Sequence, residues 1–134
     1  MYLRFMTYTC ILIVGLFFLN LLASMFYWYT SIWWFDMVMH TLGGLVLAFL
    51  GGAIFSEHIK KLSSFEIVVT ILLFVTIIGM GWEYYEYAIQ HFIKTVRLAD
   101  WSDSISDMLC DMIGGAIGVF FVLRIKRMYN THNG

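Results

Sequence analysis

The sequence has no proline, little charge and only two cysteines, and each shortage excludes a class of protein. Charged residues make up 13% of the 134 residues and hydrophobic residues 61%, which leaves too little charge to cover a soluble globule. The net charge of −1 offers no positive surface to nucleic acid. Cys10 and Cys110 fall in different apolar runs, which argues against a disulfide between them. The composition therefore indicates a membrane protein without a nucleic-acid partner.

Four apolar runs are long enough to cross a bilayer, which requires about 20 apolar residues per helix. They cover residues 5–27, 33–55, 67–88 and 104–123, and polar stretches lie at 56–66 and 90–102. The first run resembles the start of a signal peptide, but it continues to Trp28 without a soluble domain after it, so we expect an uncleaved span. The sequence predicts an all-α polytopic protein, with one transmembrane domain over residues 1–134 folded as a four-helix bundle.

The placement of lysine and arginine predicts how the four spans are oriented. In a four-span arrangement, six of these residues fall on the side of the termini and two on the other side. The larger group is Arg4, Lys60, Lys61, Arg124, Lys126 and Arg127, and the smaller is Lys94 and Arg97. Because basic residues favour the cytoplasmic side, we expect both termini in the cytoplasm of a bacterial inner or plasma membrane. Aromatic residues at 27–29 and 33–34 would then anchor the outer interface.

Seven of the nine acidic residues fall at the predicted outer side, and three separate regions supply them. They are Asp36 at the start of the second span, Glu83 and Glu86 at the end of the third, and Asp100, Asp103, Asp107 and Asp111 leading into the fourth. Residues three or four apart share a helix face, so Asp36 lies above His40 and Asp107 above Asp111. Small residues continue these rows, which indicates faces that pack against other helices.

Charged groups inside a span are costly, and two of these acids lie one and two turns inside the fourth. Asp107 and Asp111 each cost at least ~2.5 kcal/mol there without partners. Two carboxylates ~6 Å apart repel by roughly 3 kcal/mol at an effective dielectric constant near 20. His40, Lys94 and Arg97 are too few to balance the acids. We therefore expect either protonated carboxylates or a cation among them.

The donor types favour a divalent metal site, because carboxylate oxygens with one imidazole suit Mg, Mn, Fe or Zn. The predicted metal ligands are Asp36, His40, Glu83, Glu86, Asp107 and Asp111. Asp103 and Arg97 are the predicted contacts of a further ligand, with Arg97 suited to an anion. Such a site at the outer interface could bind or act on an envelope lipid or another phosphate-bearing ligand. Whether the protein is an enzyme stays open.

Two other classes of function fit the same residues. An outward-facing acidic pocket could carry protons, cations or a small ligand, and four spans would then require a homo-oligomer. Alternatively, the polar residues could only fix helix register in a structural membrane partner that binds no ion. Part of the acidity also has a simple structural explanation, because Asp100 and Asp103 are placed to cap the fourth helix.

The runs D36-M-V-M-H40, W82-E83-Y-Y-E86 and D103-S-I-S-D107-M-L-C-D111 resemble the VanZ-like membrane proteins and the related YjdF-like group. The likeness covers about residues 33 to 120. It departs from the VanZ-like pattern at Met37, where lysine is usual, and at Asp111, where asparagine is usual. The resemblance implies a small helical membrane protein with its polar site at these positions, and it implies no substrate.

Overall fold

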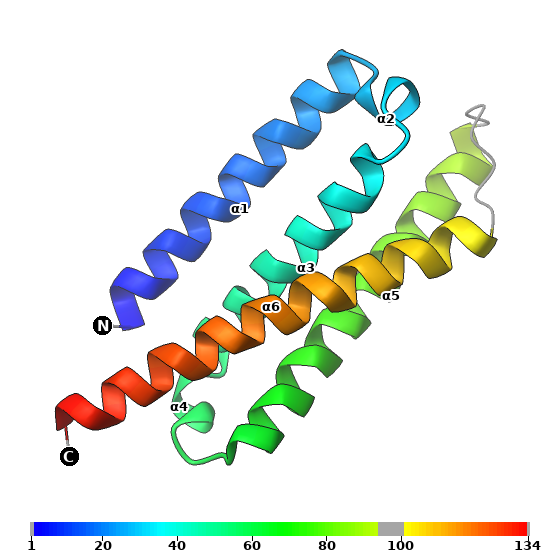
Figure 1. Cartoon of the computed structure of the whole chain (residues 1–134). Coiled ribbons are helices and arrows are strands. Elements are labelled where there is room, and N and C mark those ends of the chain that lie inside the picture. The colour runs from blue at the N-terminus through cyan, green and yellow to red at the C-terminus, as the bar shows by residue number, and fades with distance from the viewer. Residues whose placement is uncertain (1, 94–100, 134) are drawn as a thin grey trace.

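The structure is a computed structural model that describes residues 2–93 and 101–133, and these residues form six helices (Figure 1). The helices are α1 (Tyr2–Met25), α2 (Trp28–Ser31), α3 (Phe35–Ile54), α4 (Ser56–Ile59), α5 (Ser64–Ile93) and α6 (Trp101–Asn133). Four of them contain segments long and apolar enough to cross a membrane: Phe5–Met25, Phe35–Ile54, Ser64–Ala88 and Ser102–Met128. The predicted all-α fold with four spans is confirmed.

The helix boundaries differ from the predicted spans in physically simple ways. The first helix ends at Met25 because Tyr27 adopts a left-handed conformation, with φ of 56°. The short helix α2 then turns the chain into α3, and Phe35 packs edge-to-face against Trp28 and Tyr29. Helices α5 and α6 extend beyond their apolar segments, because hydropathy marks the length inside the bilayer and not the whole helix.

Both termini and α4 lie at one end of the bundle, here called the basal end (Figure 1). Lys60 and Lys61 follow α4 there, and Arg124, Lys126 and Arg127 lie in the last part of α6. The opposite end, here called the acidic end, holds the start of α3, the end of α5 and the start of α6 (Figure 1). Lys94, Arg97 and Asp100 fall between α5 and α6 in the sequence and lie outside the described residues. The described basic residues thus lie at the basal end, whereas the described acidic residues other than Glu57 and Glu66 lie at the acidic end.

Helices α3 and α6 cross at very close range, and glycine makes this possible. A Cβ at Gly44 would lie 2.0 Å from the backbone oxygen of Asp111, and a Cβ at Gly114 would lie 1.9 Å from that of Thr41. A Cβ at Gly118 would lie 2.5 Å from the Cβ of Ala48. Because small residues let helix backbones approach closely in lipid, the predicted glycine rows serve packing within the chain.

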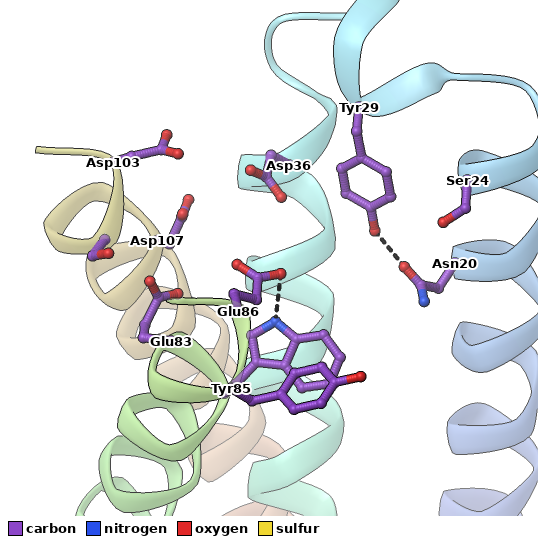
Figure 2. Close-up of a pocket in the computed structure, with 11 residues that line it drawn as sticks. Asn20, Ser24, Tyr29, Asp36, Glu83, Tyr85, Glu86, Asp103 and Asp107 are labelled. Atoms are coloured by element: carbon purple, nitrogen blue, oxygen red, sulfur yellow. Dashed lines mark hydrogen bonds between the residues drawn. The ribbon is translucent and has the colours of Figure 1, made fainter. Parts of the chain in front are cut away.

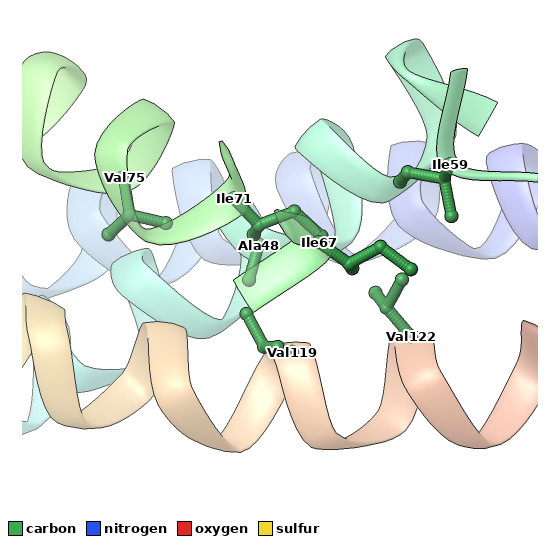
Figure 3. Close-up of a cluster of buried hydrophobic side chains, with 7 residues drawn as sticks. All are labelled: Ala48, Ile59, Ile67, Ile71, Val75, Val119 and Val122. Carbon is green, nitrogen blue, oxygen red and sulfur yellow. The ribbon is translucent and has the colours of Figure 1, made fainter. Parts of the chain in front are cut away.

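A larger hydrophobic cluster lies in the basal half of the bundle, and Figure 3 draws its buried side chains. It consists of Ala48, Ile59, Ile67, Ile71, Val75, Val119 and Val122, and it joins α3, α4, α5 and α6. By contrast, only 6% of the span in α1 is buried, and α1 packs mainly along α3. The larger cluster therefore holds three long helices together. A smaller cluster, with Ala23, Phe35 and Met39 buried, joins the end of α1 to the start of α3, while α1 exposes most of its surface.

Candidate metal centre

Six polar side chains from α3, α5 and α6 converge at the acidic end, and we call them the acid–histidine cluster. They are Asp36 and His40 of α3, Glu83 and Glu86 of α5, and Asp107 and Asp111 of α6. Figure 2 shows carboxylates from these three helices gathered around one opening. The four-residue spacings place the acids on inward faces, and the glycine contacts between α3 and α6 bring two of these faces together.

His40 lies at the centre of the cluster, with only 7% of its side chain exposed. Its Nε2 atom is 3.8 Å from Asp36 Oδ1, 3.9 Å from Glu83 Oε1 and 3.8 Å from Asp107 Oδ2. These three carboxylates therefore surround one nitrogen, and they come from three different helices. One imidazolium could offset at most one of their negative charges.

The other nitrogen of His40 faces a different carboxylate. Nδ1 lies 3.5 Å from Asp111 Oδ1, on the α6 side of the ring. The absence of a side chain at Gly79 leaves room for this carboxylate, because a Cβ there would lie 2.7 Å from Asp111 Oδ2. A carboxylate at one imidazole nitrogen orients the ring and leaves the other nitrogen free to bind a metal.

Glu83 has a buried carboxylate oxygen, Oε1, that lacks a hydrogen-bond partner within the described part of the chain. The nearest charged partner given by the structure is His40 Nε2, at 3.9 Å, which exceeds hydrogen-bond length. A buried carboxylate oxygen without a partner costs about 1–3 kcal/mol or more, so its retention points to a function or an additional partner.

The spacing of the ligand atoms fits a divalent cation. Two groups, Asp36–His40–Asp107 and His40–Glu83–Glu86, each offer ligand atoms within 4.8 Å of one another. Around Mg²⁺, with bonds of ~2.1 Å, neighbouring ligand atoms lie about 3.0 Å apart and opposite ones about 4.2 Å apart. The separations of 3.8 and 3.9 Å from His40 Nε2 lie between these values. Small side-chain movements would therefore close a coordination shell.

A cavity of about 300 Å³, here called the polar cavity, opens beside the cluster (Figure 2). Its lining includes residues that sequence analysis did not assign to the site: Asn20, Ser24, Tyr29, Trp82, Tyr85 and Ser104. Tyr29 donates a hydrogen bond of 2.6 Å to Asn20 Oδ1, and Trp82 Nε1 donates one of 3.0 Å to Glu86 Oε1. The available signal was Asn20, since an amide in an apolar span requires a polar partner.

The structure brings together five of the predicted metal ligands around or beside His40 Nε2, namely Asp36, His40, Glu83, Glu86 and Asp107. It places the sixth, Asp111, at Nδ1. Asp103 lines the polar cavity, whereas Arg97 lies outside the described residues. The site thus has carboxylates around one nitrogen of His40, a further carboxylate at the other nitrogen, and an adjoining cavity.

The sequence model of a family described as "Predicted membrane protein (DUF2238)" matches residues 1–128, so the chain belongs to this family. The match does not tie the chain to the VanZ-like or YjdF-like groups. No curated protein and no solved structure matches the chain.

Proposed function

We propose that this member of the DUF2238 family binds a divalent cation at the acidic end of its bundle. His40 Nε2 and the carboxylates of Asp36, Glu83 and Asp107 would hold the ion, and Glu86 would complete the shell. The observation that carries the proposal is the buried Glu83 Oε1, which has no hydrogen-bond partner among the described residues and faces the same nitrogen as two other carboxylates. A cation satisfies all of these groups at once.

The donor set selects the class of metal. Oxygen ligands with one imidazole suit Mg²⁺, Mn²⁺, Fe²⁺ or Zn²⁺, and neither cysteine belongs to the two groups of candidate ligand atoms. Asp111 would orient the imidazole through Nδ1 and would not contact the ion. This role differs from the ligand role that its spacing suggested.

The site's position suggests its use. The described lysines and arginines lie at the basal end. By the positive-inside rule, we propose that the acidic end faces the outer side of a cell membrane and that both termini are in the cytoplasm. A divalent cation there supplies positive charge for a phosphate oxygen. We therefore propose that the ligand is a phosphate-bearing molecule of the cell envelope, with Asp103 and Arg97 near its path. The VanZ-like resemblance falls on the same positions, and we interpret it as the same acid–histidine arrangement.

The direct test is metal content, measured by elemental mass spectrometry on the detergent-purified protein. Two variants, Asp107→Asn and Glu83→Gln, remove ligand charge with little change in shape. Glu57→Gln is the matched control, because Glu57 lies at the basal end and pairs with nearby Lys60, at 2.6 Å. We expect near-stoichiometric metal in the parent and in Glu57→Gln, and a loss of metal in both cluster variants.

The opposite result separates the alternatives. A parent that holds no metal after incubation with Mg²⁺, Mn²⁺, Fe²⁺ and Zn²⁺, and that stays folded in chelator, contradicts the proposal. Proton or cation transport by an oligomer, or a structural role for the cluster, would then explain the acids. Ion flux into vesicles would distinguish these two.

A further inference from the structure

A second cavity, of about 340 Å³, runs from the acid–histidine cluster into the apolar part of the bundle, and we call it the lateral groove. Helix α1 lines one side with Ile13 and Leu16, α5 lines the other with Ile78 and Trp82, and α3 forms its floor. Near its acidic end the groove reaches His40 and Asp111. Its surface is otherwise almost entirely apolar.

We propose that the lateral groove holds one hydrocarbon chain of a phosphate-bearing membrane lipid, whose head group lies in the polar cavity at the cation. This inference rests on the proposed cation site and names the class of ligand that the site takes. Three observations support it: the continuity of the two cavities, the depth of the groove, and its narrowness.

The two cavities are continuous in their lining. Asn20, Tyr29, Asp36, Trp82 and Glu86 contribute to both. A molecule that passes this shared boundary would have a polar part among carboxylates and an apolar part among aliphatic side chains. A phospholipid has this division, whereas a free phosphate has no part that the groove would bind.

The groove lies at the depth of lipid chains. Its lining residues in α1 and α3 fall within the apolar segments Phe5–Met25 and Phe35–Ile54. Along α3 it extends from Asp36 to Leu50, which at 1.5 Å per residue is about 21 Å. One leaflet contributes about 15 Å of hydrocarbon thickness, so a chain that starts at the acidic end can follow the groove for its full depth in the leaflet.

The groove is too narrow for a protein helix. The empty space of the groove is about 1040 Å³ even with its open side included. A helix about 10 Å in diameter occupies about 1650 Å³ over the same length of about 21 Å. A second copy of α1 or a partner's helix therefore does not fit unless α1 moves away, whereas a single hydrocarbon chain is much thinner than a helix.

The carboxylates determine how the head group binds. An acid-rich site repels a phosphate, so the cation must bridge the two. Binding of a phosphate-monoester lipid should therefore depend on the metal, and binding of the chain alone should not. This difference distinguishes a specific ligand from the lipids that surround any membrane protein.

The test uses phosphatidic acid with a diazirine in one acyl chain, and a phosphatidylcholine with the same chain as the comparison. The protein is reconstituted in phosphatidylcholine vesicles with Mn²⁺ or with EDTA, irradiated, and digested for peptide mass spectrometry. With Mn²⁺, we expect phosphatidic acid to label groove-lining residues of α1, α3 and α5. EDTA should lower this labelling at least about fivefold and leave the phosphatidylcholine labelling unchanged.

A pair of neighbouring residues on α5 supplies the matched variants. Ile78 lines the groove and is 42% exposed, whereas Ile77 is 60% exposed and does not line it. Ile78→Trp should lower groove labelling about fivefold with unchanged metal content, and Ile77→Trp should change neither. If Ile78→Trp does not fold, Ile13→Trp fills the groove from α1, with Val14→Trp as its control.

Three results would overturn the inference. One is labelling spread evenly over the groove and the Ile77 face in a protein that holds metal. This result would keep the cation site but would show that the groove is not a specific lipid site. Another is equal labelling by both lipids with and without EDTA. The third is cross-linking between α1 helices of two copies in place of lipid. Metal content measured on the same sample separates these failures from failure of the cation site itself.

Discussion

The two ends of the bundle differ in how their polar groups are paired. At the basal end, Ser63 and Glu66 cap α5 reciprocally: the Ser63 amide donates to Glu66 Oε2 at 2.7 Å and the Glu66 amide donates to Ser63 Oγ at 3.3 Å. Lys126 Nζ donates to the carbonyl of Leu62 at 2.5 Å and so joins α6 to this cap. Each of these groups has a local partner of opposite character.

At the acidic end, one buried imidazole faces four carboxylates at 3.5–3.9 Å, and a buried oxygen of Glu83 lacks a hydrogen bond among the described residues. The larger hydrophobic cluster lies towards the basal end, and a smaller one, with Ala23, Phe35 and Met39 buried, packs at the acidic end. Apolar packing thus supports both ends of the bundle, but among the described residues the buried polar atom without a hydrogen bond and the crowded carboxylates lie at the acidic end. Local violations of this kind are expected at functional sites.

The largest loss of stability should follow from a substitution at the close crossing of α3 and α6. Gly114→Val places a side chain where even a Cβ would lie 1.9 Å from the Thr41 backbone oxygen, and backbone cannot move aside as a flexible side chain can. We expect a loss of more than ~3 kcal/mol and of metal binding together. Gly15→Val is the control, because a Cβ at Gly15 meets nothing within 4 Å. Unfolding in mixed micelles measures the stability, and elemental mass spectrometry measures the metal content. A folded Gly114→Val with parental stability would contradict the close crossing.

Removing volume from the core should weaken the basal half alone. Ile71 is fully buried, and Ile71→Ala should cost about 2–3 kcal/mol. The cost stays near the low end because lipid is as apolar as the core, so the cavity and not the transfer from water supplies most of it. Metal affinity at the acidic end should persist. Ile77→Ala, on an exposed position of the same helix, should change stability by less than ~0.5 kcal/mol in the same assay.

Loss of the orienting carboxylate should weaken metal binding without abolishing it. Asp111→Asn keeps the shape of the side chain beside His40 Nδ1 but removes its charge. We expect 10- to 100-fold weaker binding of Mn²⁺, about 1.4–2.7 kcal/mol, measured by electron paramagnetic resonance of the free ion. A complete loss, equal to that in Asp107→Asn, would instead make Asp111 a direct ligand.

The smallest effect should come from the exposed ion pair at the basal end. Lys60 Nζ and Glu57 Oε1 lie 2.6 Å apart, but 77% of the Glu57 side chain is exposed. Water screens such a pair, so Lys60→Gln should change stability by less than ~0.5 kcal/mol and leave metal affinity unchanged. A larger loss of stability would show that the basal end depends on charge pairing more than its core implies.

Hydropathy and helical spacing predicted the four spans and most of the cluster. The four-residue spacing of Asp36 with His40, and of Asp107 with Asp111, correctly placed each pair on one helix face. Spacing defines which face a residue occupies, but it does not define how two helices rotate against each other. It therefore could not show that Asp111 would meet Nδ1 while Asp107 meets Nε2.

The role of α1 was harder to predict. Its span has no charged residue, and Tyr29 falls in an aromatic stretch typical of an interfacial belt. The turn at Tyr27 and the short helix α2 bring Tyr29 back onto Asn20, and both then line the polar cavity and the lateral groove. Local periodicity carries no information about such a turn, because a single left-handed residue redirects the chain.

The central claim is that the acid–histidine cluster is strained by its own charge until a cation binds. The most direct measurement is the melting temperature of the parent and of Asp107→Asn, each with EDTA and with saturating Mn²⁺. Asp107→Asn should melt higher than the parent in EDTA, because it removes a repelling charge, and lower than the parent in Mn²⁺, because it loses a ligand. If Asp107→Asn melts lower in both conditions by the same amount, the carboxylate is satisfied within the fold and the account is wrong.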